Sequence, residues 1–142
     1  MRGHLKIVKL LVAMDNIDVN ATSEHSGYHD GNLTPLNLAA LHNHAEIARL
    51  LVTAKGIDVN KDDDNNNTPL HSAALKGHVD IVELLLSVDG VAVRPRDDTW
   101  HTPFDLATYC ENDGVVKLLK KYEPVAIPYR GSASKMHQEA KQ

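Results

Sequence analysis

The feature that most constrains this chain is a phrase that its sequence repeats at a fixed spacing. The phrase reads "TPLNLAALHNHAEIARLLV" from residue 34, "TPLHSAALKGHVDIVELLL" from residue 68 and "TPFDLATYCENDGVVKLLK" from residue 102. Successive copies therefore begin 34 residues apart. A fixed period of this length is typical of an array in which each unit packs against its neighbours.

Each copy predicts a pair of short helices. Thr68 is a suitable N-cap, and Pro69 suits the first helical position because the missing amide donor would be unpaired there anyway. Gly77 can end this helix with a positive φ. The apolar face of the first helix is small, and it consists of Leu70, Ala73 and Ala74. We therefore expect a close approach by the neighbouring helix.

A second helix is expected from about residue 79 to residue 86, with Asp80 and Glu83 facing solvent. Two helices this short are marginal alone, so neighbouring units must supply the missing contacts. The polar segment between units, "KGIDVNKDDDNNN", predicts an extended projecting turn in which Asn66 adopts the left-handed conformation.

The array also has an incomplete unit and a longer loop. "GHLKIVKLL" from residue 3 aligns with "GHVDIVELL" from residue 77, and the motif "IDVN" at 17–20 recurs at 57–60 after 40 residues instead of 34. We predict one array over 1–122, followed by a tail or linker over 123–142. Its parts are a half repeat (3–21), a long loop (21–32) and repeats at about 29–62, 63–96 and 97–122.

The motif "TPLHSA" at 68–73, with "TPLNLA" at 34–39 and "TPFDLA" at 102–107, resembles the ankyrin repeat signature. The resemblance covers about residues 3 to 122. It implies an all-α solenoid of stacked helix-turn-helix units with projecting β-turn or hairpin loops. Departures occur where the family usually has a turn glycine (Asn32, Asn66, Trp100, Glu111) and where Arg94 replaces the asparagine of "IDVN".

The resemblance further implies a non-catalytic module that binds a partner protein on its concave face. The positions that map to this face are Leu33, Leu41, His42, Asp64, Asn65, Asn67, Leu75, Lys76, Asp98, Trp100, His101 and Tyr109, with Asp30 and Cys110 beside them. Trp100 is the strongest candidate, since tryptophan is enriched in interface hot spots. Its alternative role is to fold back over the last unit, and the alternative for Leu41 and Leu75 is partial burial between helices.

Other function classes receive little support from the residues. The net charge is −4, with 15 basic and 19 acidic residues interspersed, which argues against a nucleic-acid partner. We find no catalytic motif, and we expect no cofactor. Nine histidines raise a metal hypothesis, but His71 and His78 fit structural positions of the repeat. The alternative function is a targeting or substrate-recruitment domain of a larger enzyme or effector.

The N-terminal helix carries an apolar face that its own unit does not cover. The residues of this helix that are apolar are Leu5, Ile7, Val8, Leu10 and Leu11. We expect either a fragment of a longer array or a face covered by a second copy through self-association. One cysteine, no signal peptide and no long apolar segment predict an intracellular, cytoplasmic protein without a membrane partner.

Overall fold

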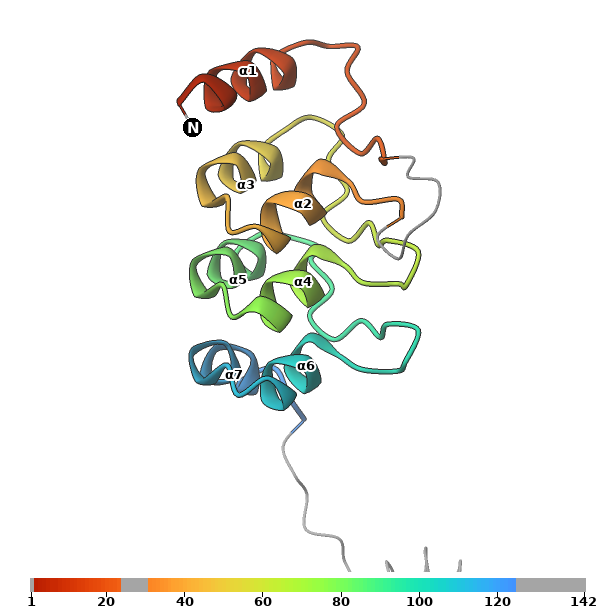
Figure 1. Cartoon of the computed structure of the whole chain (residues 1–142), viewed down its shortest axis with the longest axis vertical. Helices are drawn as coiled ribbons and strands as arrows, with labels where there is room; N and C mark the ends of the chain where they lie inside the picture. The colour runs from red at the N-terminus through yellow and green to blue at the C-terminus, as the bar shows by residue number, and fades with distance from the viewer. Residues whose placement is uncertain (1, 24–30, 125–142) are drawn as a thin grey trace, which may run out of the picture.

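The computed structural model describes residues 2–23 and 31–124, which form a stack of helices (Figure 1). Its helices are α1 (Arg2–Val12), α2 (Pro35–Leu41), α3 (Ala45–Val52), α4 (Pro69–Lys76), α5 (Val79–Leu86), α6 (Pro103–Tyr109) and α7 (Asp113–Lys120). The described residues contain no strand. The predicted all-α fold is therefore confirmed, and the predicted 79–86 helix coincides with α5.

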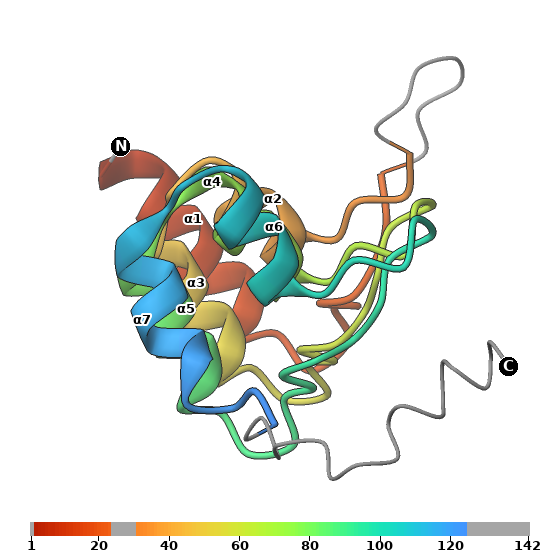
Figure 2. The same cartoon turned by 90° about the horizontal axis from the view of Figure 1, so that it is seen from below.

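The helices form two parallel columns. The second helices of the units, α1, α3, α5 and α7, pack in one column, and the first helices, α2, α4 and α6, pack in the other (Figure 1). The segments that join one unit to the next project away from both columns as loops stacked one over another (Figure 2). We call these the projecting loops. They and the first helices border the inner face of the molecule.

Each first helix begins with the same cap. Thr34, Thr68 and Thr102 each accept a hydrogen bond from the backbone amide three residues later, and the side chain of that later residue accepts from the threonine amide in return. Proline follows each threonine at the first helical position. The caps satisfy amide groups that a helix start leaves unpaired, so helices of seven or eight residues can form.

The turn between the two helices of a unit requires a left-handed residue. Gly77 has φ of +75°, as the sequence predicts, and Asn43 and Glu111 take φ of +58° and +57° at the same position of the neighbouring units. An asparagine tolerates this conformation through local hydrogen bonds, whereas glutamate does so at a cost. The three complete units keep the same turn despite the change of residue.

Alanines allow the columns to pack closely. Ala39, Ala40, Ala73, Ala74 and Ala107 are at most 2% exposed. Between them lie the leucine, isoleucine and valine side chains that fill the core, including Leu36, Leu70, Ile81 and Leu85. Asp80 and Glu83 face solvent as predicted. The core thus runs the length of the stack, and each unit buries its apolar face against the next.

Asparagine side chains connect successive loops. Asn60 donates to the Gly90 carbonyl (2.9 Å) and accepts from the Ala92 amide (2.7 Å). Asn20 makes the equivalent pair of bonds to Gly56 and Asp58. In the repeat at 63–96 Arg94 occupies this position, and its guanidinium instead pairs with Glu123 at 3.3 Å.

The two ends of the stack differ in polarity. Lys117, Lys120 and Lys121 of the last unit are exposed, as a solvated terminal unit requires. At the other end, Ile7 and Leu10 of α1 are 55% and 70% exposed. The predicted uncovered apolar face is therefore present. Part of the long loop, including Asp30, and most of the tail lie outside the described residues.

Candidate binding face

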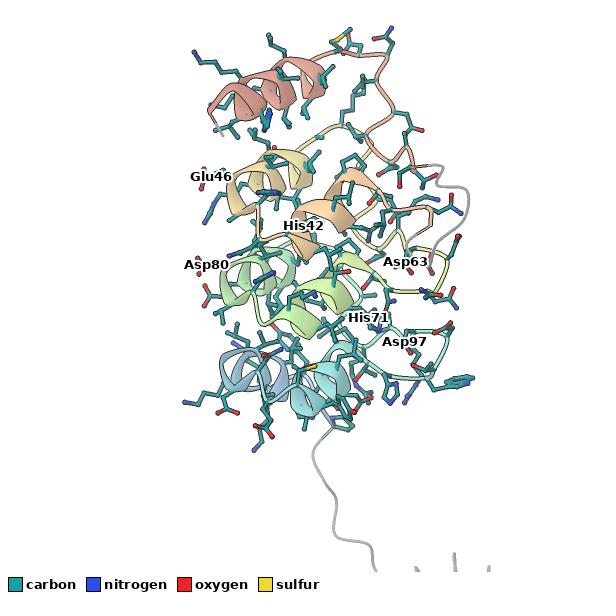
Figure 3. All side chains as sticks on the ribbon, viewed as in Figure 1. His42, Glu46, Asp63, His71, Asp80 and Asp97 are labelled. Atoms are coloured by element: carbon teal, nitrogen blue, oxygen red, sulfur yellow. The ribbon has the colours of Figure 1, made fainter. Side chains whose placement is uncertain are left out.

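An aspartate organises the second and the third projecting loop. The Asp63 carboxylate accepts from the backbone amides of Asn65 (2.8 Å) and Asn67 (2.9 Å). One period later, the Asp97 carboxylate accepts from the amides of Thr99 and His101, both at 2.9 Å. Figure 3 shows Asp63 and Asp97 at corresponding places in successive loops. These bonds fix the backbone conformation of the turn through one short side chain.

The tips of the loops are also joined to one another. The Asp98 amide donates to the Asn65 carbonyl at 3.0 Å, and the Asp64 amide donates to the Gly31 carbonyl at 3.4 Å. The predicted left-handed conformation of Asn66 is confirmed at φ +61°, and Trp100 takes φ +68° at the equivalent tip. The loops therefore form a continuous edge of the inner face.

His71 connects a first helix to the next loop. Its Nδ1 accepts from the Thr68 amide (3.1 Å), and its Nε2 lies 3.0 Å from the His101 carbonyl, to which it donates. This pair of bonds selects the neutral tautomer with the proton on Nε2. Burial lowers the pKa of His71 below its ordinary value of 6.5. The histidine thus has the structural role that the sequence indicated.

Two carboxylates, Asp97 of a projecting loop and Asp105 of the first turn of α6, are held in their charged form. Burial favours a higher pKa for Asp97, but hydrogen bonds from His101 and Thr99 outweigh it and lower the pKa. A hydrogen bond from the Thr102 amide lowers the pKa of Asp105. Neither carboxylate is free to recognise a partner, because both serve the local backbone.

A depression of about 130 Å³ lies on the inner face between the first two complete units. We call it the inner depression. Its lining comes from α2, α4 and the projecting loops, and consists of Leu33, Leu41, Asp63, Asn65, Asn67, His71, Ser72 and Leu75. Leucine side chains thus stand beside amide and hydroxyl groups. Such a site suits an apolar side chain of a partner with a hydrogen-bonding backbone next to it.

Five of the predicted binding residues meet in this depression: Leu33, Leu41, Asn65, Asn67 and Leu75. Leu33 is only 8% exposed, whereas Leu75 is 40% exposed and Leu41 is half-buried. Sequence reasoning missed Asp63, His71 and Ser72 as lining residues. Asp63 lies one 34-residue period before Asp97, and this spacing was the signal that could have revealed its role.

Trp100 lies at the loop edge and does not cover the last unit. Its side chain is 73% exposed, and the Arg96 guanidinium lies 5.9 Å from the ring centroid while donating to the Trp100 carbonyl at 2.6 Å. A shallower hollow of about 330 Å³ adjoins the ring and is lined by Asn66, Arg96, Asp97, Asp98 and Trp100. The alternative in which the indole folds back over the core is therefore wrong.

The remaining predicted residues are not gathered into either hollow. His42, Lys76 and Tyr109 lie at the ends of the first helices, where all three are exposed, Tyr109 by 87%. The Asp64 carboxylate accepts from the Asn32 side chain. The His101 side chain lies 2.8 Å from the Thr99 hydroxyl, within its own loop.

In the part of the chain that the structure describes, no three histidine, cysteine or acidic side chains gather as metal ligands. No helix there is both long enough and apolar enough to cross a membrane. A family model described as ankyrin repeats, three copies, matches residues 1–63 and 56–127. No curated protein matches the sequence.

Proposed function

Because the chain belongs to the ankyrin repeat family, whose members are generally protein–protein interaction modules and typically non-catalytic, we propose that it holds a partner protein on its inner face without turnover. We take the inner face to be the concave face expected from the sequence. We place this binding in the cytoplasm, where the single exposed Cys110 stays reduced.

The observation that carries this proposal is the inner depression. It joins leucines from α2 and α4 to loop residues whose backbone is fixed by Asp63. A preformed apolar hollow lowers the entropic cost of binding, because few side chains must be ordered when the partner arrives. We assign the anchoring contact to this hollow, where an aliphatic side chain of the partner would pack against Leu41 and Leu75.

Charge supports a partner with basic residues. Asp62, Asp64 and Asp98 are exposed on the projecting loops, and Asp98 lines the same hollow as Trp100. Exposed acidic groups around an apolar anchor raise the association rate of a basic partner, and the effect weakens as salt screens the charges. The favoured partner segment therefore carries an aliphatic side chain with lysine or arginine near it.

The test is affinity capture with the tagged full chain, comparing the wild type with Leu75→Lys and Trp100→Ala under matched expression. We expect Leu75→Lys to deplete the captured partner proteins at least about tenfold. The bound partner would bury the new ammonium group without a counter-charge, and the apolar contact with Leu75 would be lost. Trp100→Ala should deplete them less.

The matched control is Glu83→Lys, on the exposed side of the second helices, which should retain every partner. Circular dichroism checks that all variants fold. Retention of all specific partners by both Leu75→Lys and Trp100→Ala would contradict the assignment of the inner face.

A further inference from the structure

Trp100 stands at the tip of the third projecting loop, where the two preceding loops carry asparagine. Asn32 and Asn66 take φ of +61° at this position, and Trp100 takes φ of +68°. Asparagine tolerates the left-handed conformation, whereas a bulky side chain adopts it at a cost. The indole recovers little of that cost by burial, because it is 73% exposed. Most of the ring is therefore open to contact from outside the chain.

The ring already attracts one cation from its own loop. The Arg96 guanidinium lies 5.9 Å from the ring centroid, close to the outer limit of about 6 Å for a cation–π contact. Nη1 of Arg96 also donates to the Trp100 carbonyl at 2.6 Å, and this bond holds the guanidinium where it is. A cation that is free of such a bond can approach the ring more closely.

The hollow next to the ring, which we call the Trp100 hollow, has an excess of negative charge. Asp97 and Asp98 line it against the single cation of Arg96. The Asp97 carboxylate is committed to the backbone amides of Thr99 and His101. The Asp98 side chain is exposed, and its carboxylate makes no hydrogen bond or ion pair with any described residue. Asp98 can therefore pair with a cation from another molecule.

The neighbouring loop adds to the negative charge. Together the segments 61–67 and 95–101 carry five aspartates against one lysine and one arginine. The Asp98 amide donates to the Asn65 carbonyl at 3.0 Å, so the two loops are joined at this point. An acidic side chain that enters the Trp100 hollow would meet repulsion from most of these groups, whereas a basic side chain would be attracted.

We propose that the Trp100 hollow receives a lysine or arginine side chain of the partner, which packs on the indole and pairs with the Asp98 carboxylate. The ring attracts the cation through its quadrupole, and the carboxylate attracts it through its charge. Arg96 is then an internal competitor, because it repels a second cation. The proposal rests on the proposed function, since the same partner places its aliphatic side chain in the inner depression.

The test is a selection from a random peptide library displayed on phage, with the full chain as the target. We expect enrichment of peptides that carry lysine or arginine at a fixed spacing from an aliphatic residue. In synthetic, tryptophan-free copies, glutamine in place of the basic residue should weaken binding at least about fivefold. Trp100 is the only tryptophan of the chain, so its fluorescence reports on this hollow alone. Its emission should respond to the basic peptides and not to the glutamine copies.

Three variants of the chain assign the two contacts. Trp100→Asn removes the ring and keeps the turn, because Asn66 holds the same conformation in the preceding loop. This variant should lose the enrichment of basic residues and keep that of aliphatic residues. Asp98→Lys should select acidic residues in place of basic ones. Arg96→Gln should bind the basic peptides at least about twofold more tightly, because the competing cation is gone.

Tyr122→Ala and Asp80→Lys are the matched controls. They remove an exposed aromatic ring and reverse an exposed charge away from the projecting loops. Both should select the same peptides as the wild type.

Enrichment of aliphatic residues that is lost in Leu75→Lys, without any preferred basic residue, would overturn the proposal and leave the proposed function intact. A selection that enriches no peptide would overturn both. Equal binding of the basic peptides by the wild type and Trp100→Asn would attribute the preference to the loop aspartates in general and would also overturn the Trp100 hollow.

Discussion

One position of the repeat performs the same task with three different residues. Asn37, His71 and Asp105 each accept from the amide of the preceding threonine cap. The side chains of two of them also bond to a later segment: the side-chain amide of Asn37 donates to the Lys61 carbonyl at the end of the same unit, and His71 donates to the His101 carbonyl of the next unit. Of these three residues only His71 changes its charge near neutral pH, so only this unit gains a pH dependence from this position of the repeat.

We predict that His71→Asn flattens the dependence of stability on pH. The pKa of His71 is lower in the folded chain than the ordinary 6.5, so the unfolded chain binds more protons as the pH falls below that value. The free energy of unfolding of the wild type should therefore fall between about pH 7 and about pH 5, whereas the lowered pKa values of Asp97 and Asp105 act only below about pH 4.

Urea unfolding at several pH values measures this effect. His71→Asn should cost about 1 kcal/mol at neutral pH, because asparagine keeps the cap but loses the bond to the His101 carbonyl. The exposed His42→Asn is the control and should retain the wild-type slope. If the free energy of unfolding of His71→Asn changed with pH as it does in the wild type, His71 would not be the source of the pH dependence.

At the scale of elements, the turn at Gly77 combines backbone strain with close packing. A Cβ added at Gly77 would lie 2.8 Å from Oδ1 of Asn112, the side chain that joins α4 to the next unit. Gly90 has a similar positive φ of +87°, but a Cβ there would meet no atom within 4 Å. Comparing alanine substitutions at Gly77 and Gly90 therefore separates the energetic cost of the left-handed conformation from the cost of the steric contact with Asn112.

We predict that Gly77→Ala destabilises the chain more than Gly90→Ala. The left-handed conformation alone should cost about 1–2 kcal/mol in either variant. Gly77→Ala should cost more because it also displaces Asn112 from the Ala74 and Leu75 carbonyls. Chemical unfolding of both variants, and of both in an Asn112→Ala background, gives the comparison. The difference in destabilisation between Gly77→Ala and Gly90→Ala should shrink in that background. A difference that persists there would mean that a contact other than the one with Asn112 causes it.

Periodicity explains why the elements were predictable from sequence. Thr68, Pro69 and Gly77 each act through local backbone geometry, so the helix bounds and the left-handed turn followed from residue type alone. The side-chain bonds between units did not follow, because Asn60 and His71 act on residues about 30 positions away. The inner depression was predicted only in part for the same reason: Asp63 enters it through a loop shape that no local rule specifies.

For the whole molecule, stability is distributed unevenly along the stack. The middle units are covered on both sides, whereas α1 packs mainly against α3 and leaves Ile7 and Leu10 exposed. Because each unit of such an array is stabilised mainly by its neighbours, a terminal helix opens at lower free energy than the centre.

We predict that the same substitution has different effects at equivalent positions. Ile81→Ala, at a fully buried position, should cost about 2–5 kcal/mol. Ile7→Ala, at the corresponding position of α1, should cost less than about 1 kcal/mol. Hydrogen exchange should show faster exchange in α1 than in α5. Equal costs and equal protection would mean that the exposed apolar side of α1 is covered in solution.

The salt bridge between Arg94 and Glu123 has a consequence for how firmly the last part of the stack is held. Asn20 and Asn60 each hold the following loop by two hydrogen bonds to its backbone. Arg94 instead holds the segment just after α7 by one partly exposed ion pair. Because dissolved ions screen such a pair, the attachment of this segment should loosen as the ionic strength rises, whereas the loops held by asparagine should not respond.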